Sequence, residues 1–189
     1  MKELNLPSCY VVTGKFKDHD DFSDKLKRVL ENKHPLIQLK RLQSQTDEDF
    51  LQAVEIAVKI CSDFNATLIL ACSVELFEQT KAHGLHLKST AIKQCEERPI
   101  ADDKILSVSC HDLKTMQKAQ ELEADIILLS PIKETIAHPD LDPLGWEGLR
   151  EVKEQISCPV YAYGGMKMED LDDALSVGAQ GIAVSSLWR

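Results

Sequence analysis

The sequence has no CxxC pair, no apolar run long enough to cross a membrane and no excess of positive charge. Its six cysteines are scattered among apolar residues, which argues against a zinc site and is typical of small core side chains. No run reaches the ~18 apolar residues of a transmembrane helix. The first residues lack the basic end and apolar run of a signal peptide. We therefore expect a protein of the reducing cytoplasm without membrane contact.

The acidic charge balance limits the partners. The chain carries 22 Lys and Arg against 31 Asp and Glu, a net charge of −9. Such a protein repels a polyanion unless it has a local basic stripe, and the cluster of Lys25, Lys27 and Arg28 is mixed with acids. We expect no nucleic-acid partner, and any bound phosphate should be a small one held by backbone amides. The residues predict neither a metal nor an organic cofactor.

Short apolar runs alternate with longer helix-like segments along the 189 residues. Several runs are nearly continuous Val, Ile and Leu, as in strands that are buried on both faces. One helix is expected over residues 47–62, where apolar residues recur in steps of three and four. Others are expected over 113–122, with Asp112 as the cap, and over 144–156. The eight runs are residues 9–13, 36–39, 67–71, 84–87, 105–109, 125–130, 160–163 and 181–184.

Repeated strand–helix alternation predicts parallel strands joined by right-handed crossovers. Eight strands can close into a (β/α)8 TIM barrel, and an open doubly wound sheet is the alternative. The chain is short for a barrel, which typically has ~250 residues. Two features account for the missing length, because the fourth unit (residues 84–97) is brief and residues 185–189 end where an eighth helix would start. We predict a single-domain barrel over residues 1–189 with a truncated eighth helix, and the uncovered face favours a homodimer.

Function in such barrels lies on the loops that follow the strands, and those after strands seven and eight often bind phosphate. Gly164 and Gly165 follow the seventh run, and Ser185 and Ser186 follow the eighth. Glycine lacks a Cβ, so an anion can approach the backbone amides. These four residues are therefore predicted to bind phosphate. A simple tight turn is the alternative for the glycine pair.

The fifth run ends at Ser109, Cys110 and His111. An imidazole at a strand end can transfer a proton near neutral pH, so His111 is the candidate catalytic residue, with a polar turn cap as the alternative. Cys110 is poorly placed for a nucleophilic pair with His111, because adjacent strand residues point to opposite sides. Ser109, and Ser130 at the end of the sixth run, are predicted to contact substrate.

Other polar residues at strand ends are also substrate-binding candidates. Gln38 and Lys40 alternate with Leu39 and should point into the barrel, where Lys40 needs a negative partner such as a ligand phosphate or Glu75. The alternative is that Lys40 lies at the rim and is solvated. Thr135 and His138 lie in a long loop after the sixth run, where a functional lid and an ordinary loop are equally supported. His86, on the fourth run, is interpreted as a packed core histidine.

The motifs, taken in order, resemble the thiamine-phosphate synthase/TenI superfamily over nearly the whole chain. The branch they most resemble is the TenI-like domain often fused behind a Nudix (MutT-like) hydrolase. These motifs are YVVTGK, LIQLKR, GLHL, SVSCH, ADIILLSPIKET, PLGWEGL, CPVYAYGGM and VGAQGIAVSS.

The resemblance implies which synthase positions are kept. Synthases of this family join a pyrimidine pyrophosphate to a thiazole phosphate with magnesium held by aspartates. Those ligand positions hold Ala71-Cys72 and Ala91 here, and neither alanine nor a thiol suits magnesium. The family's Gln-x-Arg-x-Lys reads Gln38, Lys40 and Leu42, and only the first residue of Thr-x-Thr-Lys remains, as Thr135. The glycine pair and Ser186 of the thiazole-phosphate site are present.

TenI proteins resemble thiazole tautomerases that need no metal and use a histidine after strand five, a position that His111 matches. The resemblance therefore implies a metal-independent thiazole tautomerase that binds a small phosphorylated heterocycle. Two alternatives remain. One is a non-catalytic phosphate-binding module that works beside a Nudix hydrolase partner. The other is a divergent thiamine-phosphate synthase with rearranged ligands, for example through Glu75.

Overall fold

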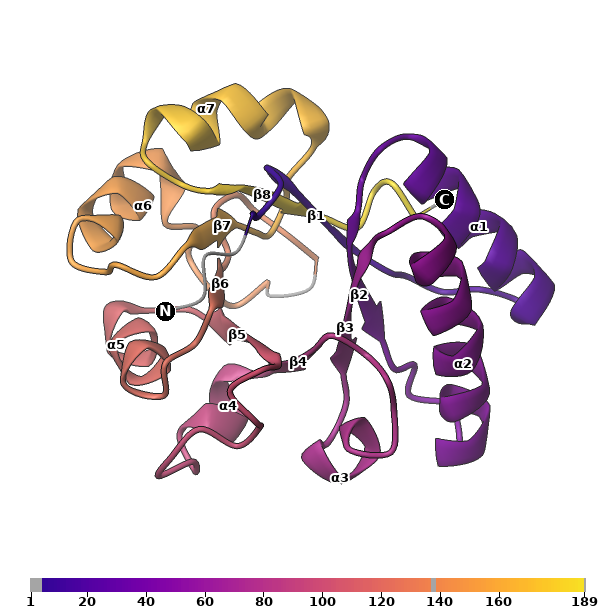
Figure 1. Cartoon of the computed structure of the whole chain (residues 1–189). Helices are drawn as coiled ribbons and strands as arrows, with labels where there is room; N and C mark the ends of the chain where they lie inside the picture. The colour runs from indigo at the N-terminus through magenta and orange to yellow at the C-terminus, as the bar shows by residue number, and fades with distance from the viewer. Residues whose placement is uncertain (1–4, 137–138, 189) are drawn as a thin grey trace.

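The computed structural model describes residues 5–136 and 139–188, and eight parallel strands within them close into a barrel (Figure 1). Each strand pairs with the next one along the chain, and β1 pairs with β8 through registers such as Val11 with Val184. This closure excludes the open doubly wound sheet. The strands are β1 (Cys9–Val12), β2 (Leu36–Lys40), β3 (Thr67–Ala71), β4 (Gly84–Leu87), β5 (Ile105–Cys110), β6 (Ile126–Leu129), β7 (Val160–Ala162) and β8 (Gly181–Val184).

Helices surround the barrel in the order that the sequence predicts (Figure 1). Within the described residues no helix follows β8, and Trp188 instead packs its ring 5.5 Å from that of Phe22 on α1. None of the described helices is long and apolar enough to span a membrane. The helices are α1 (His19–Glu31), α2 (Asp47–Asp63), α3 (Val74–Phe77), α4 (Ser89–Ile92), α5 (Leu113–Glu121), α6 (Gly145–Lys153), a 3-10 turn (Met168–Asp170) and α7 (Leu171–Ser176).

The apolar residues form two concentric cores. The larger fills the layer between strands and helices and includes Val11, Leu39 and Phe50. The smaller lies inside the barrel and includes Tyr10 and Tyr161, whose ring centroids are 5.5 Å apart. Strand side chains alternate between the two layers, as the period of two requires.

The predicted elements match the structure except at some ends. The predicted helix over residues 144–156 is too long, because α6 ends at Lys153 and the chain then turns, with the Ile156 N–H donating to the Lys153 carbonyl at 3.2 Å. Pro159 follows shortly and disfavours helical backbone in the residue before it. The predicted sixth strand is also too long at both ends, because β6 is Ile126–Leu129, although the Asp125 N–H still donates to the Leu106 carbonyl at 2.9 Å and the Ser130 N–H to the Cys110 carbonyl at 3.0 Å.

Candidate active site at the mouth of the barrel

Most residues predicted to form a site lie at one end of the barrel, because parallel strands have their carboxyl ends together. His111 follows β5 and Ser130 follows β6, where the Ser130 N–H donates to the Cys110 carbonyl at 3.0 Å. The glycine pair follows β7, and Ser185 begins the segment after β8. β5, β6, β7 and β8 are consecutive neighbours, so these loops lie next to one another.

The glycine pair after β7 is required by local packing. Gly164 and Gly165 have φ of 86° and 71°, a region that favours glycine. A Cβ on Gly165 would lie 2.6 Å from the Glu134 carbonyl oxygen and 2.8 Å from Lys133 Cβ. The tight turn offered as an alternative is therefore present. The amides of this turn remain available as well, because no hydrogen bond within the described residues uses the Gly164, Gly165 or Met166 N–H.

An ion pair ties this turn to the loop after β6. Lys133 Nζ lies 2.6 Å from the carboxylate of Asp170, which is 4% exposed. The second oxygen of Asp170 accepts from the Lys167 N–H at 2.9 Å. Burial alone would raise the pKa of Asp170, but these two hydrogen bonds and the lysine charges hold that pKa below its ordinary value. The loops after β6 and β7 are thus held together.

The His111 ring is oriented by the neighbouring strand. Its Nδ1 lies 2.7 Å from the Ser130 carbonyl oxygen. A carbonyl oxygen only accepts, so Nδ1 carries a proton and donates it to the Ser130 carbonyl. The backbone is fixed too, because Asp112 and Thr115 form a capping box at the start of α5. The arrangement gives a half-buried imidazole with a defined tautomer at the mouth.

Inside the barrel, polar residues form a connected cluster below the mouth. Gln38 is 5% exposed and its amide oxygen lies 3.0 Å from the Tyr10 hydroxyl. His86 contacts Ser107 Oγ through Nδ1 and Ser109 Oγ through Nε2, each at 2.8 Å. The inward direction expected for Gln38 and the buried position expected for His86 are both observed. Sequence reasoning missed Tyr10 and Ser107, although strand alternation places both on the inner face.

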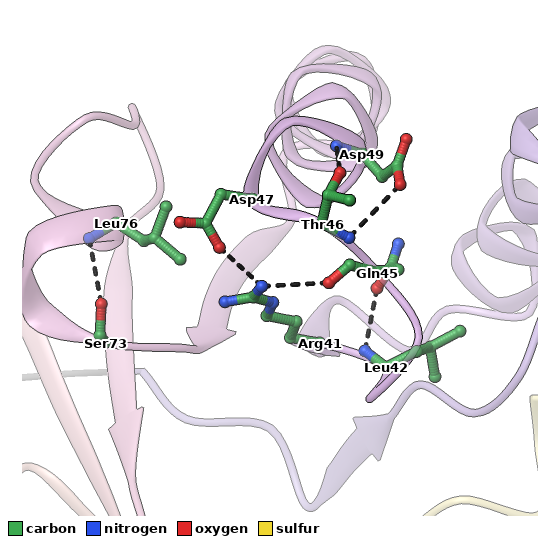
Figure 2. Close-up of polar contacts among 8 residues, drawn as sticks. All are labelled: Arg41, Leu42, Gln45, Thr46, Asp47, Asp49, Ser73 and Leu76. Atoms are coloured by element: carbon green, nitrogen blue, oxygen red, sulfur yellow. Dashed lines mark hydrogen bonds and ion pairs between the residues drawn. The ribbon is translucent and has the colours of Figure 1, made fainter.

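The two basic residues at the carboxyl end of β2, Lys40 and Arg41, have separate surroundings. Lys40 is exposed at the strand end, and its N–H donates to Thr13 Oγ1 at 2.9 Å. Arg41 points toward the start of α2, where it lies 2.6 Å from Asp47 Oδ1 and donates to the Gln45 carbonyl (Figure 2). The Arg41 charge is therefore paired with the Asp47 carboxylate.

The loop after β6 borders a hollow of about 500 Å³. Glu134 and Thr135 line it, and Glu134 is also the residue whose carbonyl faces Gly165. The hollow is therefore next to the glycine turn. His138, the other residue predicted in this loop, lies outside the described residues.

Two further residues considered from the sequence, Cys110 and Glu75, have different surroundings. Cys110 is fully buried and faces the outer core, and burial raises the pKa of its thiol to about 12. Such a thiol is not ionised at neutral pH, in agreement with the argument against a nucleophilic pair. Glu75 is exposed on α3. Among the described residues, no three His, Cys, Asp or Glu side chains are grouped as a metal site.

The fold and the polar mouth define a class of protein: single-domain (β/α)8 barrels that carry their polar residues on the loops after the strands. Comparison with known proteins narrows the class. The family model described as thiamine monophosphate synthase (TMP-TENI) matches residues 9–187. The chain therefore belongs to the thiamine-phosphate synthase/TenI family.

Individual relatives agree with this assignment. The thiamine-phosphate synthase of Flavobacterium psychrophilum is 30% identical over 169 residues, which cover 86% of this chain and 82% of that protein. The one from Methanobrevibacter smithii is 27% identical over 187 residues, covering 98% and 88%. The thiamine phosphate pyrophosphorylase structure from Pyrococcus furiosus superposes with a TM-score of 0.79 at 22% identity, over 96% of this chain and 88% of that one, which shows the shared fold.

Proposed function

We propose that this protein binds a small phosphorylated heterocycle of thiamine metabolism at the barrel mouth and moves a proton on it without a metal. The reaction class is a thiazole tautomerisation, in which a proton passes between a carbon and a nearby atom. The orientation of His111 carries the proposal. Its Nδ1 donates to the Ser130 carbonyl at 2.7 Å, and the proposal assigns the proton exchange with the substrate to Nε2.

The phosphate has a separate place in this proposal. The amides of Gly164 and Gly165, with Ser185 and Ser186 on the neighbouring strand end, hold it. Gln38, Lys40, Ser109, Ser130 and Thr135 surround the heterocycle. An anchored phosphate keeps the reacting carbon close to the imidazole, which lowers the entropic part of the barrier.

A divergent thiamine-phosphate synthase is the second candidate, and the names of the relatives favour it. Opposing it, Ala71, Cys72 and Ala91 occupy the positions at which the family pattern has its magnesium ligands. A third arrangement is a non-catalytic phosphate-binding module beside a Nudix hydrolase. It has the same binding site and no turnover.

One experiment separates the three candidates. The tautomerisation of thiazole carboxylate phosphate is followed by NMR with wild type, His111→Ala and His111→Gln. General acid–base catalysis contributes about 100-fold or more, so both variants should lose at least that factor in kcat while phosphate affinity is kept. Equal background rates in all three proteins, with binding intact, would leave the non-catalytic phosphate-binding module as the only candidate. Magnesium-dependent formation of thiamine phosphate would establish the synthase instead.

A further inference from the structure

A chain of hydrogen bonds runs inside the barrel from the Gln38 amide to the mouth. Tyr10 contacts Gln38 at 3.0 Å and Ser107 at 3.3 Å. Ser107 contacts one nitrogen of His86, and Ser109 contacts the other. Ser107 is fully buried, whereas Ser109 is half-buried at the end of β5, two residues before His111. This chain of hydrogen bonds therefore connects the barrel interior to the place where a ligand would lie.

The number of available protons fixes the direction of each bond. The Gln38 amide oxygen only accepts, so the single phenol proton of Tyr10 is donated to it. The contact between Tyr10 and Ser107 must then use the Ser107 proton. Ser107 has no second proton, so His86 Nδ1 donates to its oxygen.

The same argument sets the outer end of the chain. A neutral imidazole has one proton, and His86 uses it at Nδ1, so Nε2 accepts from the Ser109 hydroxyl at 2.8 Å. The ring is neutral because burial, helped by the Lys40 and Lys88 charges, lowers the pKa of His86 to about 3. Ser109 consequently offers only oxygen lone pairs to the mouth.

We infer that His86 is a positioning residue that keeps Ser109 as a hydrogen-bond acceptor, so that the site selects ligands with an N–H or O–H donor at this point. The inference rests on the proposed function, because it takes the phosphorylated ligand to lie across the mouth. Phosphate oxygens are acceptors and are disfavoured beside Ser109. The phosphate is thereby directed to the loops after β7 and β8, and the donor end of the ligand to β5.

The tautomer of His86 tests the direction of these hydrogen bonds without a ligand. Long-range ¹H–¹⁵N spectra of histidine-labelled protein show which ring nitrogen carries the proton, and the wild type should carry it on Nδ1. In Tyr10→Phe, Ser107 is free to donate to Nδ1, so the Nε2–H form should gain population. Tyr161→Phe is the matched control, because it removes a buried phenol that donates to the Pro7 carbonyl, outside this chain. A proton on Nε2 in the wild type would overturn the inference.

Selectivity is tested by calorimetry with two probes, the phosphate ester of 4-methyl-5-(2-hydroxyethyl)thiazole and its 2-amino derivative. One additional hydrogen bond corresponds to about tenfold in affinity, so the wild type should prefer the amino probe by that factor. The preference should disappear in Ser109→Ala, decrease in Tyr10→Phe and persist in Tyr161→Phe. Equal affinities of the wild type for the two probes would overturn the inferred selectivity. If neither probe binds, the proposed function fails. The spectra of His86 still decide the direction of the hydrogen bonds.

Discussion

At the residue scale, His86 connects the chemistry of the mouth to the stability of the fold. Burial lowers the pKa of its ring from 6.5 to about 3. In the unfolded chain the ring takes up a proton below pH 6.5, whereas the folded ring does so only near pH 3. Because the unfolded state binds more protons in this window, His86 destabilises the fold as the pH falls through it.

We predict that His86→Gln reduces the acid dependence of the free energy of unfolding. One group with this shift contributes about 1.4 kcal/mol per pH unit below its unfolded pKa. In urea titrations at about pH 7 and about pH 5, the wild type should lose roughly 1–2 kcal/mol more than the variant. Carboxylates titrate in both proteins, so their effect cancels in the comparison. The same pH dependence in both proteins would contradict a buried neutral ring.

Strand alternation in the sequence predicts that Gln38 faces inward, and the strand ends locate His111, Ser130 and Gly164. It does not predict that the Ser130 carbonyl fixes the His111 tautomer, or that Tyr10 reaches Ser107. These contacts join residues 19 and 97 positions apart. They depend on barrel closure and strand register, which local patterns do not contain.

At the element scale, closure of the barrel depends on close approach between β8 and the segment before β1. A Cβ on Gly181 would overlap the Ser8 carbonyl oxygen, and the Ser8 carbonyl accepts from the Ile182 N–H at 2.9 Å. Any side chain at Gly181 must therefore displace backbone that closes the barrel. Gly148 differs, because it lies within α6 and an added Cβ would meet only Leu144 side-chain atoms at 3.4 Å.

We predict opposite effects of alanine at these two glycines. Gly181→Ala should lower the free energy of unfolding by about 2 kcal/mol or more, as backbone displacement and overpacking do. Gly148→Ala should raise it by about 0.5–1 kcal/mol, because alanine favours helix. Denaturant titration of the three proteins measures both. A Gly181→Ala protein as stable as the wild type would show that β1 and β8 do not meet as described.

The sequence predicts the elements well where buried runs are long and uninterrupted, as over β3 and β8, whose bounds match. It is less accurate at the ends of other elements. β6 is shorter at both ends than the predicted run, and α6 ends at Lys153, before a turn in which the Ile156 N–H donates to the Lys153 carbonyl. Such ends depend on which backbone groups pair in the folded chain, and the apolar period carries no information about that.

At the scale of the whole molecule, eight strand–helix units predict a parallel sheet but do not by themselves close it. Closure is a pairing between β1 and β8, which lie at opposite ends of the sequence. The short fourth strand–helix unit favours a closed barrel over an open sheet, and the structure confirms the barrel. A barrel of this kind supports many activities, so the function rests on the residues at the mouth.

The central claim, that the loops after β7 and β8 hold the phosphate of a small ligand, is tested most directly by placing a carboxylate there. Calorimetric titration with the phosphate ester of 4-methyl-5-(2-hydroxyethyl)thiazole compares wild type, Ser186→Asp and Ser62→Asp. Ser62 is an exposed serine on the last turn of α2, at the other end of the barrel. Like charges in contact repel, so Ser186→Asp should bind at least about tenfold more weakly while Ser62→Asp binds as the wild type does. Equal affinity of Ser186→Asp and wild type would contradict the account.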